Sequence, residues 1–253
     1  MQLGSKRQLA IRIGRVPLLL QAGEDAMLET AARRYSFFRT PSRQGLPIFL
    51  QRVASRPRLR QGFHYDLRGR CLELASGQAR FSGVSSEYDL DSLLRILLSV
   101  VLLEKRGFLL HAATVVRNGK AYVFMGRSGA GKSTVASLAP AGTVLTDEIS
   151  LIRCDHGAWQ AYGTPFWGEF RAEGQNRCAP LAGIFSLVQA PHNRTAPIRG
   201  TQALAAMLGN TLFFAPGREA RENLLGILAG LVVAVPVHRL EFKKDASFWE
   251  VLP

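Results

Sequence analysis

Nine consecutive residues, 126–134, read Gly-Arg-Ser-Gly-Ala-Gly-Lys-Ser-Thr and complete the pattern Gly-x-x-x-x-Gly-Lys-[Ser/Thr]. Glycine at the fixed positions lets successive backbone N–H groups turn inward around an anion, because no Cβ stands in the way. The lysine can neutralise charge on the outer phosphates of a nucleotide, and the serine hydroxyl can ligate Mg²⁺. This spacing therefore predicts binding of a nucleoside triphosphate together with Mg²⁺.

Different positions of this loop have different predicted roles. We expect Lys132 to bond the β- and γ-phosphates, Ser133 to ligate Mg²⁺, and Thr134 to face the following helix as a structural residue. Arg127 is a candidate phosphate contact, although a basic residue is common there without that role. The predicted nucleotide-binding residues are Gly126, Arg127, Ser128, Gly129, Ala130, Gly131, Lys132, Ser133 and Thr134.

An acidic pair, Asp147-Glu148, follows an apolar run at residues 143–146 and is the second group that could do chemistry. We interpret Asp147 as the base that orients and deprotonates an attacking hydroxyl, and Glu148 as a metal ligand, directly or through water. The reverse division stays open, because both carboxylates begin the same turn. A role confined to capping that turn is the alternative without chemistry.

Four further side chains are candidates outside these two motifs. His111 stands on an apolar strand, where a lone histidine is often a core residue, and a role near the phosphates is the alternative. Glu169 is a candidate metal ligand or a solvent-facing acid on a loop. Arg194 and Arg199 flank a loop that contains proline and could contact the γ-phosphate.

The elements around the loop follow an unusual order. Residues 121–125 predict a strand that enters the loop, and residues 133–138 predict a short helix that leaves it. A strand at 108–116 precedes them, and Asn118-Gly119 is a strong two-residue hairpin signal. The acidic pair lies only 15 residues after Lys132. A hairpin that feeds the loop, followed so soon by acids, differs from the parallel βαβ unit of ordinary P-loop ATPases and GTPases.

This arrangement resembles the HPr kinase/phosphorylase group of bacterial P-loop serine kinases, which are related in fold to phosphoenolpyruvate carboxykinase. The resemblance rests on Leu110-His111-Ala112, the loop 126–133 and Thr146-Asp147-Glu148. It covers residues 107–155 and continues loosely through 162–166 and 235–242. The chain is closer in outline to stand-alone HPr-kinase-related proteins and lasso-peptide serine kinases, because residues 1–100 do not resemble the N-terminal domain of the bifunctional enzyme.

The resemblance implies an α/β fold with an HPr-kinase/phosphoenolpyruvate-carboxykinase-like P-loop core at residues 87–253. Hydrophobic periodicity predicts a small N-terminal α+β lobe at residues 1–86. It implies an ATP- and Mg²⁺-dependent kinase that transfers the γ-phosphate to a Ser hydroxyl of a peptide or small carrier protein. The implied catalytic residues are Lys132, Asp147 and His111, and the implied metal ligands are Ser133 and Glu148. Glu169 stays a further candidate metal ligand from its place in the sequence.

The sequence departs from the family pattern at two points, and three other functions are alternatives to the kinase. Glu148 stands where the bifunctional enzyme has Asp, and the segment that supports phosphorylase chemistry is missing, so we do not expect phosphorolysis. A nucleotide-dependent regulatory or partner-binding module, or a slow ATPase, is the alternative function. An ABC-type ATPase is disfavoured by the short spacing and by the lack of a Leu-Ser-Gly-Gly-Gln-like segment.

Length and composition predict a globular cytoplasmic protein. The chain has 253 residues, of which 47% are apolar, so it can bury a sizeable core. Its apolar runs are too short or too interrupted for a membrane span, and its first residues lack the apolar core of a signal peptide. Three scattered cysteines imply neither zinc nor a disulfide framework, and they suit a reduced compartment.

The net charge of +13 is concentrated near the N-terminus, where residues 1–85 hold 15 Lys/Arg against 5 Asp/Glu, or +10. Such a surface could attract an acidic peptide, a carrier protein or nucleic acid, or it could be a solvated face with high Arg usage. Nucleic acid is disfavoured, because no recognition motif accompanies the charge. An acidic protein partner and a homo-oligomer stay open.

Hydrophobic periodicity predicts the remaining elements. In the lobe we expect strands at 8–21, 46–53, 63–67 and 71–74 and a helix at 24–37. A further helix begins at the Ser85-Ser86-Glu87 signal, with Asp89 in its first turn, and runs to Leu103. In the core we expect a strand at 183–187, helices at 201–213 and 218–233, and a closing strand at 235–242.

Overall fold

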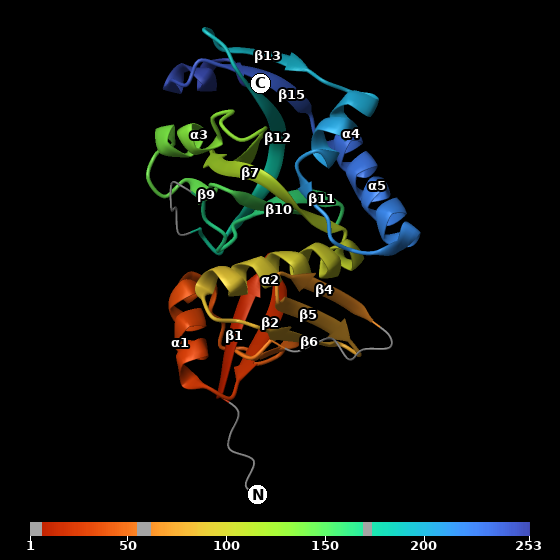
Figure 1. Ribbon diagram of the computed structural model, residues 1–253. Coiled ribbons are helices and arrows are strands. Elements are labelled where there is room, and N and C mark those ends of the chain that lie inside the picture. The colour runs from red at the N-terminus through yellow and green to blue at the C-terminus, as the bar shows by residue number, and fades with distance from the viewer. Residues whose placement is uncertain (1–6, 55–61, 169–173) are drawn as a thin grey trace, which may run out of the picture. The chain divides into compact units, whose positions relative to one another are not determined.

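The computed structural model describes residues 7–54, 62–168 and 174–253 (Figure 1). The chain divides into two compact units, residues 1–98 and residues 99–253. Over the described ranges the fold is mixed α/β, with two β-sheets and five α-helices. The division falls inside helix α2 (Glu87–Val101), whereas the boundary expected from the sequence lies just before that helix.

A six-stranded sheet forms the centre of the first unit, in the order β1-β2-β3-β6-β5-β4. Strand β3 runs parallel to both of its neighbours, and the other pairs are antiparallel. Helix α1 (Asp25–Arg34) packs on β1 and β2. The strands are β1 (Arg7–Ile13), β2 (Val16–Ala22), β3 (Leu46–Leu50), β4 (Phe63–Leu67), β5 (Arg70–Ala75) and β6 (Gln78–Ser82).

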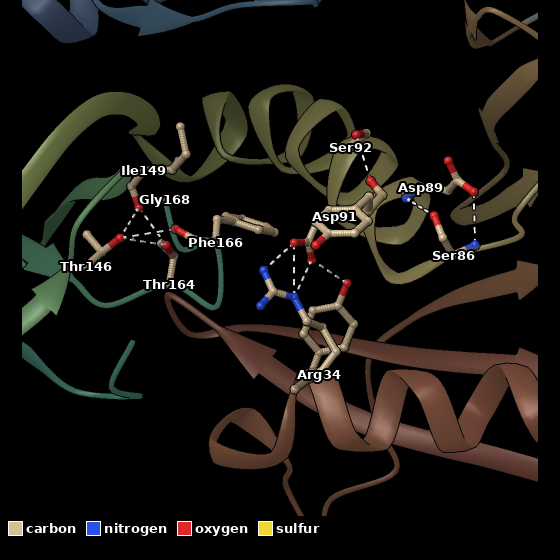
Figure 2. Close-up of polar contacts among 12 residues, drawn as sticks. Arg34, Ser86, Asp89, Asp91, Ser92, Thr146, Ile149, Thr164, Phe166 and Gly168 are labelled. Carbon is tan, nitrogen blue, oxygen red and sulfur yellow. Dashed lines mark hydrogen bonds and ion pairs between the residues drawn. The ribbon is translucent and has the colours of Figure 1, made fainter. Parts of the chain in front are cut away.

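The start of α2 confirms the capping signal read from the sequence. Asp89 Oδ2 accepts a hydrogen bond from the backbone N–H of Ser85 at 2.9 Å. It also accepts from the Ser86 N–H at 3.0 Å, and Ser86 Oγ accepts from the Asp89 N–H at 3.3 Å (Figure 2). Burial acts to raise the pKa of Asp89, but these bonds and the charge of Arg70 outweigh it, so the pKa is lowered. The reciprocal bonds satisfy N–H groups that a helix start leaves without intrahelical partners.

A buried ion pair joins α1 to α2 inside the first unit. Arg34 Nε lies 3.0 Å from Asp91 Oδ2, and the Tyr35 hydroxyl donates to Asp91 Oδ1 at 2.9 Å (Figure 2). Burial raises the pKa of Asp91 even though both neighbours stabilise its charged form. Burial, followed by the charge of Asp91, raises the pKa of Tyr35 well above its ordinary value of 10.0. These contacts compensate the cost of burying polar groups between the two helices.

The second unit is built on a nine-stranded sheet in the order β11-β10-β7-β8-β12-β15-β13, with β9 and β14 also paired to β7. Because β11 pairs with β12 as well as β10, five of these strands form a closed circuit of pairings. The strands are β7 (Gly107–Arg117), β8 (Lys120–Met125), β9 (Val144–Thr146), β10 (Ile149–Asp155), β11 (Ala158–Tyr162), β12 (Cys178–Gln189), β13 (Arg194–Pro197), β14 (Thr211–Leu212) and β15 (Val237–Phe242).

Helices cover this sheet on two sides (Figure 1). One apolar cluster packs β7, β8 and β12 against α4 (Gly200–Leu208) and α5 (Gly217–Ala234), with Met207 and Leu228 fully buried. A second cluster packs other faces of the same strands against α3 (Lys132–Leu138) and the 3₁₀ segment η3 (Ala246–Glu250), around Phe124 and Phe248. The strands that carry the loop are therefore held in a rigid core.

Most elements predicted around the loop are confirmed, with one correction. Asn118 and Gly119 have φ values of 51° and 74°, as a two-residue hairpin between β7 and β8 requires. The helix expected at 201–213 was wrong at its end: α4 stops at Leu208, and residues 211–212 form strand β14 against β7. Gly209 is the C-cap of the helix, and after it the backbone carbonyl of Asn210 accepts a hydrogen bond from the His111 N–H at 2.7 Å, which joins this segment to β7.

Within residues 7–54, 62–168 and 174–253, none of the helices combines the length and the apolar character needed to cross a membrane. The longest of them, α5, has 18 residues and begins with Gly-Arg-Glu-Ala-Arg-Glu.

Candidate functional site

The glycine-rich loop joins the end of β8 to the start of α3. Its three glycines, Gly126, Gly129 and Gly131, have φ values of 154°, 78° and 116°, in the region that side chains disfavour. A Cβ added at Gly131 would stand 2.9 Å from the Phe242 ring. The loop closes on itself through the Ala130 N–H, which donates to the Arg127 carbonyl at 3.1 Å. The backbone is thus folded into the kind of cradle that can receive an anion.

Lys132, the first residue of α3, points back into this loop. Its Nζ donates to the carbonyl oxygens of Gly126 at 2.9 Å and Arg127 at 3.3 Å, and its side chain is buried. Burial lowers the pKa of Lys132, and the negative charge of Glu148 opposes that shift. A partly desolvated ammonium group gains more from an oxyanion than a solvated one does, so the residues present fit a phosphate group.

Strand β7 brings the acidic pair to the loop. Ala112 of β7 is the register partner of Met125, the last residue before the loop, and its N–H donates to the Glu148 carbonyl at 2.9 Å. Strands β9 and β10 both pair with β7, and Asp147-Glu148 is the turn between them. The predicted acids and the predicted phosphate loop therefore flank the same point of one strand.

Hydrogen bonds hold the acidic turn in place (Figure 2). The hydroxyls of Thr146 and Thr164 both donate to the Ile149 carbonyl, at 3.1 and 2.5 Å. The Gly168 N–H donates to Asp147 Oδ1 at 3.0 Å. Asp147 is buried and Glu148 half-buried, so the surroundings orient the first carboxylate, and the second residue is partly accessible to solvent.

A pocket of about 750 Å³ opens beside the loop. Residues 126–130 form one wall, residues 186–189 at the end of β12 form a second, and the end of α4 with Asn210 forms a third. His111 also lines it, which places this half-buried histidine next to the loop. Because β8 and β12 are parallel, the pocket lies at the carboxyl ends of both strands, where α/β folds bind ligands.

The family of the chain follows from residues 88–253, which match the family described as SynChlorMet cassette protein ScmC. The chain belongs to the ScmC family. The match to the ScmC family contains the loop, the acidic pair, His111 and all lining residues of the pocket. The comparison with curated proteins found no match.

Other predicted residues are not brought into this site. Arg194 lies on β13, the third strand from β8 in the sheet order, and Arg199 is the residue directly before α4. Glu169 lies outside the described residues, so its role as a metal ligand stays a prediction. Among the residues that the structure describes, no three His, Cys, Asp or Glu side chains are grouped to hold a metal ion.

Three residues around this candidate site were missed by sequence reasoning. Thr164 and Gly168 support the acidic turn, and Gln189 donates through Nε2 to the Gly129 carbonyl of the loop. There is also a steric reason for glycine at position 168, because a Cβ there would stand 3.1 Å from Glu148 Cβ. The Gly-Thr-Pro segment at 163–165 is a turn signal that marks this region, but no local signal identifies Gln189.

Proposed function

We propose that this protein is a P-loop serine kinase with an HPr-kinase-like core, which transfers the γ-phosphate of ATP to a Ser hydroxyl of a peptide or small carrier protein. The observation that carries the proposal is the placement of the glycine-rich loop and of Asp147-Glu148 on either side of Ala112. Phosphoryl transfer needs the phosphate clamped, its charge neutralised and one acceptor oxygen aligned. The loop, Lys132 and the acidic turn can supply these functions.

The proposed roles follow the surroundings of each residue. The loop N–H groups and Lys132 bind the outer phosphates, and Asp147, held by the Gly168 N–H, takes the proton of the acceptor hydroxyl. The serine oxygen forms a bond to the γ-phosphorus, the bond to the β-phosphate oxygen breaks, and ADP leaves. Ser133 and Glu148 are the side chains that would hold Mg²⁺, which would screen phosphate charge when bound.

The acceptor is expected among proteins encoded with this one. The matching family is described as a cassette protein, so peptides or carrier proteins from the same cassette are the first candidates. The +10 charge of residues 1–85 favours an acidic acceptor. Such attraction should weaken as salt shortens the screening length well below ~10 Å. A reaction that consumes ATP also fits a cytoplasmic location.

The test is to incubate the purified protein with Mg-ATP and each candidate peptide, and then to locate the added phosphate by fragmentation mass spectrometry. The expected product carries phosphate on Ser, and the Asp147→Asn protein yields far less of it. Phosphate on Asp, His or a free metabolite would overturn the serine-kinase proposal. Release of inorganic phosphate without a labelled acceptor would indicate a slow ATPase, and nucleotide binding without turnover would indicate a regulatory module.

A further inference from the structure

The pocket beside the loop has a third wall that the proposed clamping of phosphate does not use. This wall is the last turn of α4 and the two residues after it, with Ala205, Ala206, Gly209 and Asn210 lining the space. The pocket volume of about 750 Å³ is much larger than a phosphate group needs and is ordinary for a substrate site. The wall therefore has room for a second reactant.

The chemistry of the wall favours a peptide backbone. The small methyl group of alanine and the absence of a side chain in glycine allow another chain to approach closely, and Asn210 contributes an amide. Its Nδ2 donates to the Ala206 carbonyl at 2.9 Å, which fixes the amide at the wall. Among the described lining residues, Arg127 alone carries a formal charge and none is Phe, Tyr or Trp. A purine base would more commonly be held by apolar and aromatic walls.

The position of the pocket also suits an acceptor. Its lining includes the first half of the loop and His111. His111 directly precedes Ala112, whose N–H binds the Glu148 carbonyl at 2.9 Å. A chain lying in the pocket could therefore present a hydroxyl between the loop and the acidic turn.

We propose that this pocket binds the acceptor segment in an extended form, with small uncharged or acidic residues beside the target serine. The end of α4 sets the size limit, and Arg127 excludes basic neighbours by like-charge repulsion. This inference rests on the proposed kinase function, because it names the second substrate of the same site.

Gly209 offers a clean way to fill the pocket. Its backbone is right-handed helical, with φ of −65°, so any residue can adopt it. A Cβ there meets only two carbonyl oxygens within 4 Å, those of Ala205 at 3.5 Å and Ala206 at 3.9 Å. Gly209→Ala and Gly209→Leu therefore add volume in two steps without backbone strain. Gly226→Leu is the matched control, because Gly226 is exposed on α5 and a Cβ there meets nothing within 4 Å.

The experiment uses the full chain, Mg-ATP and a degenerate peptide library with one fixed Ser and flanking positions randomised without Ser, Thr or Tyr. We expect Gly209→Leu to raise the KM for the pooled peptides about tenfold and to shift the selected neighbours of Ser toward Gly and Ala. Gly209→Ala should lie between this variant and the wild type. The Gly226→Leu control should keep the wild-type KM and the wild-type residue preference. The Kd for ATP, measured by calorimetry, should be the same in all variants.

Three other results would overturn the inference, and each has a different meaning. An unchanged residue preference in Gly209→Leu, with an active wild type, overturns the pocket assignment and leaves the kinase function standing. A weaker Kd for ATP in Gly209→Leu but not in Gly226→Leu assigns the pocket to the nucleobase instead. Failure of the wild type to phosphorylate the library or any cassette peptide, despite binding ATP, overturns the kinase function and this inference together.

Discussion

The backbone N–H of Ala112 donates to the carbonyl oxygen of Glu148 at 2.9 Å, while Met125 pairs with Ala112 in the β7–β8 register. One residue thus fixes the distance between the strand that feeds the loop and the turn that carries the acids. Side-chain bonds next to this residue also hold β10 to β7, because Ser150 Oγ donates to the Ala112 carbonyl at 2.9 Å and lies 2.6 Å from Thr114 Oγ1. A preorganised arrangement of this kind is what phosphoryl transfer requires.

The first prediction tests whether Asp147 is the general base and Glu148 the metal ligand. Asp147→Asn keeps an oxygen that can accept from the Gly168 N–H but removes the charge, so the turn should persist. We expect ATP binding to remain and kcat to fall on the order of 10²-fold or more, the usual effect of losing a general base. Glu148→Gln should instead raise the Mg²⁺ concentration needed for activity. A nearly fully active Asp147→Asn beside a dead Glu148→Gln would show that the roles are reversed.

The second prediction concerns Thr164 as a positioning residue. Thr164→Val keeps the shape and removes the hydroxyl that donates to the Ile149 carbonyl, which should cost about 1 kcal/mol of unfolding free energy. We expect kcat to fall several-fold while the KM for ATP stays constant, because the loop is untouched. Thr195→Val, which removes a hydroxyl bond to the Val251 carbonyl, is the matched control. Equal losses of kcat in both variants would show that Thr164 contributes only to stability and does not position the acidic turn.

The third prediction separates backbone strain from steric clash when a methyl group is added at a glycine. Gly131→Ala combines a φ of 116° with a Cβ that would stand 2.9 Å from the Phe242 ring. Gly119→Ala, in the hairpin, has a φ of 74° and open space, so it carries backbone strain alone, about 1–2 kcal/mol. Urea unfolding should show Gly131→Ala as the more destabilised variant, and only this one should lose ATP affinity. Equal unfolding free energies would contradict the packing of Phe242 against the loop.

The loop and its hairpin could be predicted from sequence because their constraints are local. Gly126, Gly131 and the Asn118-Gly119 turn need particular backbone angles, and residue type records that need. The support of the acidic turn could not be predicted, since Thr164 reaches Ile149 across 15 residues by way of a separate strand. The end of α4 was missed because the apolar pattern continues past Asn210, although Gly209 and Asn210 are a local helix-stop signal. The pairing of residues 211–212 with β7 is the long-range part of this error.

The fourth prediction is a pH effect on the first unit. The folded pKa of Tyr35 lies above the unfolded value of 10.0, so its contribution to stability is complete below that pH and is lost as pH rises through the folded pKa. Tyr35→Phe removes a hydrogen bond to a charged acceptor, which should cost about 1.5–3 kcal/mol at neutral pH. The difference in unfolding free energy between this variant and the wild type, measured by urea unfolding, should become smaller above pH 10. Tyr88→Phe, on the exposed face of α2, should show no such gap.

The measurement that tests the central claim most directly is a calorimetric titration of Mg-ATP into the wild type, Lys132→Ala and Lys120→Ala. Lys132 Nζ lies in the loop, 2.9 Å from the Gly126 carbonyl, whereas Lys120 is exposed at the start of β8. The account predicts saturable binding to the wild type, the same Kd for Lys120→Ala, and a Kd at least about tenfold weaker for Lys132→Ala. An unchanged Kd for Lys132→Ala, or no binding to the wild type, would contradict the assignment of this loop as the phosphate site.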